Sequence, residues 1–360
     1  MSMGTLLPMA ESIPIAGRIV GDDARPFVIA ELSGNHNQSL DRALALVDAA
    51  AGAGAHGLKL QTYTADTMTL DIADGAFRID DPTSLWHGRT LYDLYHEAHT
   101  PWEWHAELFD RARTHGMIPF STPFDNTAVD FLETLDAPLY KIASFEVTDT
   151  PLIRRVAETG KPMLISTGMA SIEEIQLAVD TALGAGNDQI VLLKCTSSYP
   201  APASDLNLLT IPAMRERFGC LVGLSDHTRN NVSSIVSVAL GATVIEKHMT
   251  LDRTEGGVDS AFSLEPDEFG TLVQESEVAW KARGYVHFGV SAAEEGSLQF
   301  RRSLYCVRDI AAGETFTSEN VRAIRPGLGL PPSDINAVIG RLATTEITRG
   351  TPLSWECISD

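Results

Sequence analysis

The stretch FVIAELSGNHNQSLDRALALVDAAAGAGAHGLKLQTY (27–63) contains one complete strand–helix–strand unit. Its apolar runs FVIAEL and GLKLQTY are continuous rather than alternating, which is typical of strands that are buried on both faces. Between them, Ser39 is placed as the N-cap of an amphipathic helix, and Gly52 and Gly54 mark the end of that helix. A buried strand, a surface helix and a second buried strand form the repeating unit of a parallel α/β fold.

Six further apolar runs of the same kind follow. They are MIPFST, LYKIAS, PMLIST, IVLLKCTS, LVGLSD and TVIEKHM, beginning at residues 117, 139, 162, 190, 221 and 243. Amphipathic helical patterns alternate with them over residues 101–115, 127–135, 151–159, 171–186, 208–218, 231–240 and 266–283. Eight strand–helix units over about 260 residues match the size of a (β/α)8 TIM barrel. A doubly wound open sheet is the alternative, but unbroken alternation favours closure into a barrel.

The strand starts are 22 to 31 residues apart, except for one gap of 60 between the second and third strands. The extra residues, 64–99, are rich in Asp, Trp and Tyr and follow a strand on the catalytic face of a barrel, so we expect a loop that covers the substrate. After Gly284 the helical periodicity stops, and short strand patterns alternate with Gly and Pro turns. The sequence therefore predicts a barrel over residues 1–285, a linker over 286–300 and a small β-rich domain over 301–360.

The composition excludes several classes of function. The 27 Lys and Arg residues against 48 Asp and Glu give a net charge of −21, so no overall field attracts a nucleic acid or an anionic membrane. The four cysteines include no CxxC pair, which excludes a zinc ribbon and a thioredoxin-like motif. No apolar run reaches the roughly 18 residues of a membrane span, and MSMGTLLPMAESIPIAG lacks the basic flank of a signal peptide. We expect a cytoplasmic protein that binds neither nucleic acid nor membrane.

Polar residues stand at the carboxyl ends of all eight predicted strands. In a barrel these ends converge on one mouth, where active sites lie. From the first strand to the eighth, the residues are Glu31; Lys59 and Gln61; Thr122; Lys141, Ser144 and Glu146; Ser166; Ser197; Ser225, Asp226 and His227; and Glu246 and His248. The sequence therefore predicts one shared site.

The types of these residues indicate an anion held beside a metal ion. Lys59 and Lys141 supply positive charge, and the serine and threonine hydroxyls supply donors for phosphate or carboxylate oxygens. His227 and His248 suit a borderline divalent ion such as Mn²⁺, Co²⁺ or Zn²⁺, although a lone histidine is more often an oriented core residue. His36, in GNHN, is either a third participant or only a hydrogen-bonding loop residue.

Several motifs together resemble one enzyme family. AELSGNHNQSLDRAL, GLKLQTYTADTMTL, TPWEWH, FSTPFDNTAVDFLE, YKIASFE, ISTGM, KCTSSYPAP, GLSDHT and VIEKHMTL are similar to the nonulosonate (sialic acid) synthases. RRSLY, RPGLG and RGTPL resemble the antifreeze-like (SAF, β-clip) domain that follows the barrel in those enzymes. The resemblance covers residues 14–358. AELSGNHN, LYDLYHEAHTPWEWH and SSYP are most similar to the pseudaminic branch of the family.

The resemblance implies a transferase that condenses phosphoenolpyruvate with an open-chain, N-acetylated amino-sugar aldose and releases phosphate. In the pseudaminic branch this sugar is 2,4-diacetamido-2,4,6-trideoxy-L-altrose. The resemblance also implies a divalent metal, with Mn²⁺ first and Mg²⁺ or Co²⁺ as alternatives. It further implies a homodimer in which the antifreeze-like domain is swapped between chains.

Individual residues gain expected roles from the same resemblance. The metal would be held by His227 and His248, and the attacking water would be positioned or deprotonated by Glu31 or Glu146, unless one of these only pairs with a lysine. Phosphoenolpyruvate would be bound by Lys59, Thr122, Lys141, Ser144, Ser166 and Ser225. The sugar would be bound by Gln61, Tyr199, Asp259 and, from the second domain, Arg325. Ser197 departs from the Asn that neuraminate synthases place on this strand.

Other functions stay open at this point. A neuraminate or legionaminate synthase would use the same mechanism on another sugar. A non-catalytic sugar-binding or ice-binding protein would release no phosphate from phosphoenolpyruvate, and neither would a barrel metal aldolase or hydrolase. Phosphate release with a panel of sugars therefore separates these alternatives.

Overall fold

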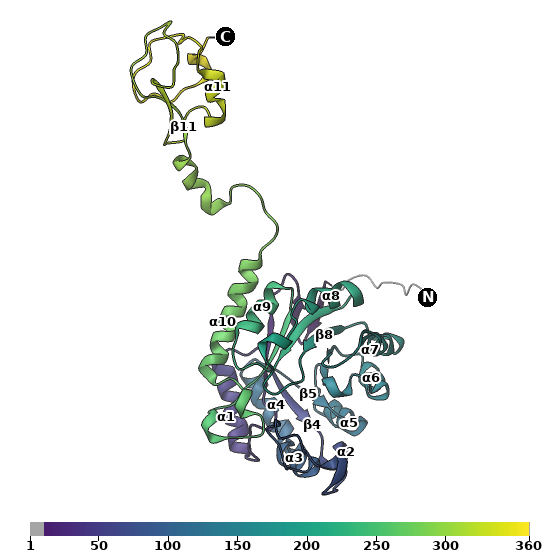
Figure 1. Ribbon diagram of the computed structural model, residues 1–360. Helices are drawn as coiled ribbons and strands as arrows, with labels where there is room; N and C mark the ends of the chain where they lie inside the picture. The colour runs from purple at the N-terminus through teal and green to yellow at the C-terminus, as the bar shows by residue number, and fades with distance from the viewer. Residues whose placement is uncertain (1–10, 360) are drawn as a thin grey trace. The chain divides into compact units, whose positions relative to one another are not determined.

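The computed structural model describes residues 11–359, and the chain divides into two compact units after Gly284 (Figure 1). Residues 1–10, which make up most of the segment assessed for a signal peptide, lie outside the described residues. Within the described part of the chain, no helix combines the length and hydrophobicity that crossing a bilayer requires.

The first unit is a closed barrel of eight parallel strands, as the sequence predicts. The strands are β3 (Phe27–Glu31), β4 (Gly57–Thr62), β5 (Ile118–Pro123), β6 (Tyr140–Ile142), β7 (Met163–Ser166), β8 (Ile190–Cys195), β9 (Leu221–Asp226) and β10 (Val244–His248). Their order around the ring follows their order in the chain, and β10 pairs with β3 to close it. This is the topology of a (β/α)8 barrel.

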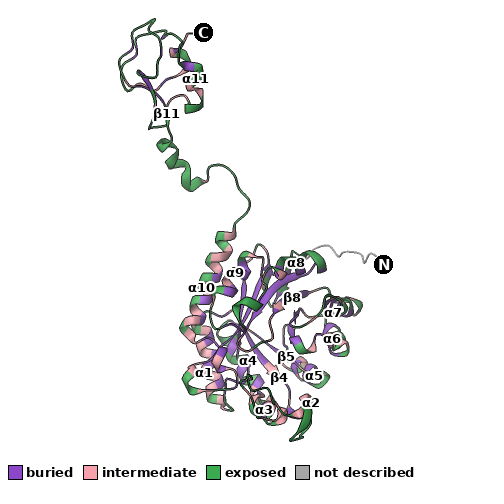
Figure 2. Ribbon diagram, in the orientation of Figure 1, coloured by how far each residue is buried: buried purple, intermediate pink, exposed green. Residues whose placement is uncertain are grey.

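Helices surround the buried strands and turn their exposed faces outward (Figure 2). They are α1 (Leu40–Gly52), α4 (His105–Thr114), α5 (Asn126–Thr134), α6 (Thr150–Ala157), α7 (Ile172–Gly184), α8 (Thr210–Phe218), α9 (Val232–Ala239) and α10 (Pro266–Arg283). The predicted N-cap is confirmed, since Ser39 accepts a hydrogen bond from the backbone N–H of Arg42. Ser171 caps α7 in the same way and forms a capping box with Glu174.

A hairpin that sequence reasoning missed closes the amino-terminal end of the barrel. It consists of β1 (Ser12–Ile15) and β2 (Arg18–Gly21), paired antiparallel. Its side chains Ile13, Ile15 and Val20 belong to the same buried cluster as the interior residues at the starts of the barrel strands. A second, larger cluster packs the outer faces of the strands against the helices. The carboxyl ends of the strands are left as the open end.

The insertion between β4 and α4 is folded. It contains α2 (Ala65–Met68), a 3₁₀ turn (Gly75–Phe77) and α3 (Leu91–Ala98). A short 3₁₀ turn (Trp102–Trp104) then leads into α4.

The second unit is small and has its own core. It begins with a 3₁₀ helix (Ala292–Phe300) in the segment that the sequence assigns to a linker. The strands β11 (Ser303–Cys306) and β12 (Val321–Ile324) pair antiparallel, isolated bridges join the remaining turns, and α11 (Ile335–Val338) completes the unit. Leu304, Phe316 and Val338 are among its fully buried side chains.

Candidate active site

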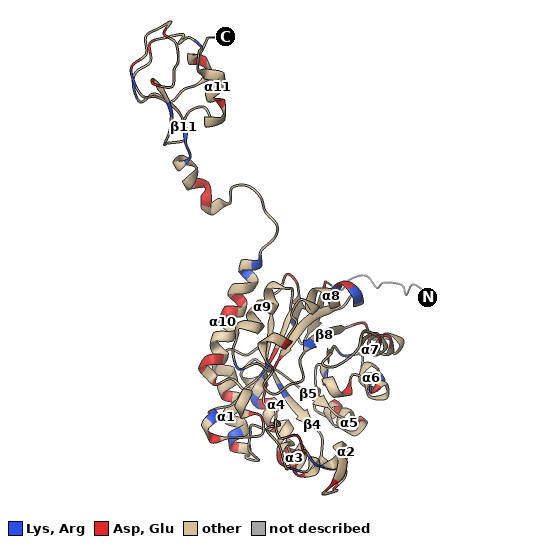
Figure 3. Cartoon of the chain, viewed as in Figure 1, with Lys and Arg blue, Asp and Glu red and all other residues tan. Residues whose placement is uncertain are grey.

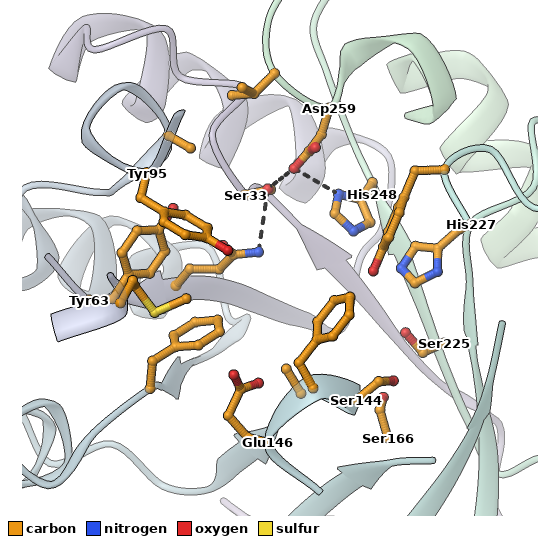
Figure 4. A pocket seen from close by; sticks show the side chains of 18 of the residues that line it. Ser33, Tyr63, Tyr95, Ser144, Glu146, Ser166, Ser225, His227, His248 and Asp259 are labelled. Atoms are coloured by element: carbon orange, nitrogen blue, oxygen red, sulfur yellow. Dashed lines mark hydrogen bonds and ion pairs between the residues drawn. The ribbon is translucent and has the colours of Figure 1, made fainter. Parts of the chain in front are cut away.

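A cavity of about 340 Å³ lies at the carboxyl ends of the barrel strands (Figure 4). Most of the predicted site residues line it, namely Lys59, Gln61, Lys141, Ser144, Glu146, Ser166, Tyr199, Ser225, His227, His248 and Asp259. Glu31 and Thr122 are buried beside the cavity without lining it, and Thr122 accepts a hydrogen bond from Lys59 at 3.2 Å. Arg325 belongs to the second unit.

Two lysines and two glutamates form a buried ionic cluster at the polar end of this cavity. Lys59 Nζ lies 2.9 Å from Glu31 Oε2 and 3.3 Å from Glu246 Oε2. Lys141 Nζ lies 3.3 Å from Glu246 Oε1, which also accepts a hydrogen bond from Ser225 at 2.9 Å. Sequence reasoning placed Glu246 at a strand end but gave it no role. Its spacing of two residues from the strand-end histidine was the available signal, because it puts both side chains on one face.

The charges in this cluster do not cancel. Burial disfavours the ionised form of Glu246, but Lys141 and Lys59 together hold the pKa of its carboxyl well below the usual range. Burial raises the pKa of Glu31 to about 7, and Lys59 opposes that rise only in part. Glu246 and Glu31 raise the pKa of Lys59 against the effect of burial, whereas burial lowers the pKa of Lys141. The two amines thus face one ionised carboxylate, Glu246, and a second, Glu31, that is only partly ionised near pH 7. The site is locally positive, whereas acidic side chains lie along α10 and around α3 on the outside of the unit (Figure 3), so the cluster can attract an anion.

Glu146 is the unpaired carboxyl group of the cavity. It follows β6 in a 3₁₀ turn (Ser144–Glu146), and its Oε2 atom is buried with no hydrogen-bond partner among residues 11–359. Burial raises its pKa to about 7, against the opposing charge of Lys141. A carboxyl group with a pKa near neutrality can both accept and return a proton. Glu31, in contrast, is held by Lys59 and accepts a hydrogen bond from Gln61 at 2.9 Å.

Serine hydroxyls face the cavity beside the lysines. Ser144 Oγ accepts the backbone N–H of Gly168 at 3.1 Å. Ser166 Oγ is buried and has no hydrogen-bond partner within the described residues, so it can donate to a ligand. Gly168 makes this packing possible, because a Cβ atom there would lie 2.7 Å from Ser144 Oγ and would overlap the hydroxyl of Ser197. Ser197 therefore packs against Gly168 beside Ser144 and does not itself line the cavity.

His227 and His248 face each other with ring centroids 5.3 Å apart (Figure 4). The Nδ1 of His227 donates to the carbonyl of Thr196 at 3.1 Å, so in the neutral form of this ring the lone pair is on Nε2. The Nδ1 of His248 is buried without a hydrogen-bond partner in the described chain, 3.8 Å from the carboxylate of Asp259. Burial, and then the charge of His227, keep the pKa of His248 well below its ordinary value.

This donor set fits a divalent ion. Two imidazoles offer nitrogen ligands, and the rest of the coordination shell would be left to solvent and substrate. The described residues contain no group of three or more His, Cys, Asp or Glu side chains placed to hold an ion, so a metal here would depend on those outside ligands. His36 is not a further ligand of this kind, since its Nδ1 accepts the N–H of Gln38 and the residue does not line the cavity.

Cys195 is a site residue that sequence reasoning missed. In the sequence Cys195 is one residue of the apolar run IVLLKCTS and was given no role, but its Sγ lies 3.8 Å from Nδ1 of His227 and the residue lines the cavity. Burial opposes ionisation of the thiol, yet His227 outweighs it and lowers the pKa of Cys195 to about 6. Burial alone would lower the pKa of His227, but the thiolate of Cys195 has the larger effect, so the pKa of His227 is raised. The two side chains therefore form one electrostatic unit.

A fully buried ion pair lies behind the two histidines, on the outer side of the same strands. Lys247 Nζ is 2.8 Å from Asp226 Oδ2, and both side chains are 0% exposed. Lys247 also donates to Thr228 Oγ1 at 3.0 Å and to the carbonyl of Asn230 at 2.9 Å. Asp226 accepts two serine hydroxyls of α9 at 2.7 and 2.6 Å. Because side chains alternate along a strand, this network ties β9 to β10 directly behind the site.

The residues predicted to meet the sugar lie together beside the histidines. Gln61 Nε2 lies 3.4 Å from the Ser33 hydroxyl, which in turn donates to Asp259 (Figure 4). The ring of Tyr199 packs against His227 with 4.6 Å between centroids. Ser33 was not predicted, because in the sequence it is one of several polar residues in the loop after the first strand.

The insertion supplies the far wall of the cavity. The residues that it contributes are Met68, Ile79, Trp86, Leu91, Leu94, Tyr95 and Ala98. Trp86 Nε1 donates to the carbonyl of Val258 at 3.0 Å and so joins the insertion to the loop after β10. The sequence indicated a loop over the substrate here but named none of these residues.

Known families and proteins match both units of the chain. The NeuB family profile matches residues 46–288, and the SAF domain profile matches residues 301–359. Pseudaminic acid synthase of Campylobacter jejuni is 42% identical over 331 residues, which cover 92% of this chain and 96% of that protein. N,N'-diacetyllegionaminic acid synthase of Legionella pneumophila is 34% identical over 348 residues, covering 94% and 96%. The crystal structure of N-acetylneuraminic acid (sialic acid) synthetase from Leptospira borgpetersenii has a TM-score of 0.73 and 29% identity, covering 81% of this chain and 97% of that chain.

Proposed function

This chain belongs to the NeuB family, and we propose that it is a pseudaminic acid synthase that condenses phosphoenolpyruvate with 2,4-diacetamido-2,4,6-trideoxy-L-altrose. The observation that carries the proposal is a single cavity in which two lysines, both bound to Glu246, lie beside two histidines. The pseudaminic relative is 42% identical to the chain and the legionaminic relative 34%, which supports the choice of sugar. A legionaminate or neuraminate synthase would use the same polar residues.

Phosphoenolpyruvate would bind at the polar end of the cavity. Its phosphate and carboxylate need positive charge, which Lys59 and Lys141 supply, and hydroxyl donors, which Ser144, Ser166 and Ser225 supply. The lysines are already held in place by Glu246, so little reorganisation is needed when the anion arrives.

We propose that His227 and His248 hold a divalent ion, with Mn²⁺ as the first choice. A metal bound there would polarise the aldehyde carbonyl of the sugar and stabilise the negative charge that develops on its oxygen. The chain's own part is to aim the two rings. The carbonyl of Thr196 orients His227, and strand β10 places His248 next to it.

The condensation forms a bond between C3 of phosphoenolpyruvate and C1 of the sugar, and the aldehyde oxygen becomes a hydroxyl. Water then adds at the electron-poor C2, and loss of phosphate by C2–O cleavage yields the 2-keto acid. We assign the proton of that water to Glu146, because its buried Oε2 has no partner in the described chain and the residue lines the cavity. Glu31 is instead assigned to holding Lys59.

Phosphate release tests the proposal. Wild-type protein is incubated with phosphoenolpyruvate and, in parallel, the altro-configured diacetamido sugar, the legionaminic precursor and N-acetylmannosamine. We expect the highest kcat/KM with the altro sugar. A higher value with N-acetylmannosamine would refute the assignment to this branch, and no phosphate release with any sugar would favour a non-catalytic sugar-binding protein.

Removal of the metal tests the proposal that His227 and His248 hold a divalent ion. Exhaustive chelation, or His248→Ala, should abolish phosphate release and leave the circular dichroism spectrum unchanged. Restoration by Mn²⁺ in the chelated wild type, but not in the variant, would assign the ion to this site. Full activity in protein whose metal content is measured as nil would exclude a catalytic metal.

We also propose a homodimer in which the second unit of one chain completes the site of the other. Tyr285, Val286 and Phe288 are 82%, 87% and 93% exposed in the single chain, and large apolar side chains in such a run favour burial against a second copy. Arg325 would then reach the partner's sugar. Mixing His248→Ala with Arg325→Ala chains should restore about a quarter of wild-type activity after dimer exchange, because half the dimers are mixed and each holds one intact site. No recovery despite verified exchange would place each site within one chain.

We propose a cytoplasmic location because the cysteines form no disulfide bonds in the described chain. All four, Cys195, Cys220, Cys306 and Cys357, are free thiols, which supports a reducing compartment.

A further inference from the structure

The cavity has two unlike halves. One half is polar and contains the lysines, the serines, Glu246 and the histidines described above, and Glu146 lies between the two halves (Figure 4). The other half is apolar, and the insertion 64–99 provides most of it. Tyr63 and Tyr95 mark the apolar half in Figure 4, across the cavity from His227 and His248. We use the name insertion wall for the aliphatic side chains that the insertion contributes, which are Met68, Ile79, Leu91 and Leu94.

The apolar character is confined to the side of the insertion that meets the cavity. The insertion carries nine Asp, Glu and Arg residues, and none of them lines the cavity. In α3 the lining residues are Leu91, Leu94, Tyr95 and Ala98, at positions i, i+3, i+4 and i+7. This spacing puts them on one face of the helix, while Asp93 and Glu97 are exposed. An apolar helix face that meets a cavity is suited to the apolar part of a ligand.

Hydrogen bonds to the rest of the barrel hold the insertion in place. The side chain of Gln38 donates to the carbonyls of Glu97 and His99, at 2.8 and 2.7 Å, at the carboxyl end of α3. The bond from Trp86 to the carbonyl of Val258 fixes the tip of the insertion. The wall is therefore attached at two points and presents a preorganised surface rather than a loose loop.

We propose that the insertion wall selects sugars by the chemistry of the end remote from the aldehyde, favouring a methyl group at C6 and the methyl of an acetamido group over hydroxyl groups. The orientation rests on the proposed function, which places the aldehyde at the histidines, so that the sugar chain extends toward α3. A methyl group leaves water for an apolar surface, whereas a hydroxyl group gives up hydrogen bonds to water and meets aliphatic carbon. Discrimination by a surface of this kind is about ten- to a hundredfold per group.

The experiment uses one substitution at three positions of the insertion. Leu91→Gln and Leu94→Gln introduce an amide into the insertion wall, and Leu70→Gln is the control, since Leu70 is 60% exposed and does not line the cavity. Each protein is assayed for phosphate release with the 6-deoxy diacetamido sugar and with its 6-hydroxy counterpart. We expect wild type and Leu70→Gln to prefer the 6-deoxy sugar by about ten- to a hundredfold in kcat/KM. The two wall variants should lower that ratio by about tenfold, mainly through KM for the 6-deoxy sugar.

Three outcomes separate this proposal from the proposed function. If the wall variants keep the circular dichroism spectrum of wild type and its preference ratio, the insertion wall does not select the sugar. An equal change in Leu70→Gln would also overturn the proposal. If wild type uses N-acetylmannosamine and neither altro sugar, the proposed function fails, and the wall is then judged by the same ratio measured with N-acetylmannosamine and its 6-deoxy counterpart. Leu91 is only partly buried, so its variant serves if Leu94→Gln does not fold.

Discussion

Replacement of Asp226 by alanine should destabilise the barrel by about 3–5 kcal/mol. The substitution leaves the ammonium group of Lys247 fully buried with two neutral acceptors, a hydroxyl and a carbonyl, in place of a carboxylate at 2.8 Å. Burial lowers the pKa of Lys247 even beside its partner, so removal of Asp226 leaves an amine whose charged form is disfavoured. For a unit of this size the loss corresponds to a fall in Tm of about 5–8 °C.

Chemical denaturation followed by far-UV circular dichroism measures this loss, and a second variant makes the reasoning refutable. In Asp226→Ala/Lys247→Met both charges are gone, and exchanging a buried ion pair for apolar groups is often close to neutral. We therefore expect the double variant to regain at least about half of the stability lost in the single variant. A cost below about 1 kcal/mol for Asp226→Ala, or strict additivity of the two single changes, would refute the account.

The pH dependence of this stability has a defined sign. Burial opposes ionisation of Asp226, but Lys247 outweighs it and holds the folded-state pKa below the ordinary 3.8. The ionised carboxylate of Asp226 therefore makes its full contribution to the free energy of unfolding above pH 3.8. That contribution is lost as the pH falls through the lower pKa of the folded state. The difference in unfolding free energy between wild type and Asp226→Ala should therefore shrink in acid as Asp226 is protonated.

Three further predictions concern activity. Glu146 must be ionised to take the proton of the attacking water, and its pKa in the ligand-free protein is raised to about 7, so kcat/KM should increase with pH around a midpoint near 7. Glu146→Gln should remove this limb and lower kcat by about 10²–10⁴, and a flat wild-type profile of kcat/KM would contradict the assignment. Gly168→Ala should push the Ser144 hydroxyl aside and raise KM for phosphoenolpyruvate by about tenfold with little loss of stability, and an unchanged KM would exclude Ser144 from that contact. Trp86→Phe keeps an aromatic ring, although a smaller one, and removes the hydrogen bond to the carbonyl of Val258. KM for the sugar should rise by up to about tenfold, while KM for phosphoenolpyruvate stays constant. Equal changes in both constants would argue against a role of the insertion in sugar binding.

The barrel could be predicted because its signal repeats. Each of the eight apolar runs becomes a strand within one or two residues of its expected start. The hairpin Ser12–Gly21 could not be predicted in this way. Its strands are four residues long and one contains Pro14, and its stability comes from burying Ile13, Ile15 and Val20 against strand residues far along the chain. Tertiary packing of that kind leaves no periodic pattern in the sequence.

The candidate site was predictable as a position and less so as a set of roles. Strand-end polarity identified ten residues that line one cavity, and the family resemblance added Tyr199 and Asp259. It could not show which of Glu31 and Glu146 handles the attacking water, because the two differ only in their partners. Glu31 is paired with Lys59, whereas Oε2 of Glu146 has no hydrogen-bond partner in the described chain. Nor could it reveal Cys195 or the aliphatic residues of the insertion, since apolar side chains in a sequence are read as core until a cavity is seen beside them.

The hairpin at the amino-terminal end leaves the barrel with one entrance. Within the described residues, apolar side chains fill that end, and the cavity that holds Lys59 and Lys141 lies at the other end, where the insertion lines part of it. If the sugar binds against α3 as proposed, it would lie on the insertion side of the lysines, and we expect phosphoenolpyruvate to bind first. Geometry rather than relative affinity would thus impose a compulsory order of binding. A sugar that binds before phosphoenolpyruvate would form a dead-end complex. Inhibition by excess sugar at low phosphoenolpyruvate concentration is therefore the expected kinetic sign of this order of binding.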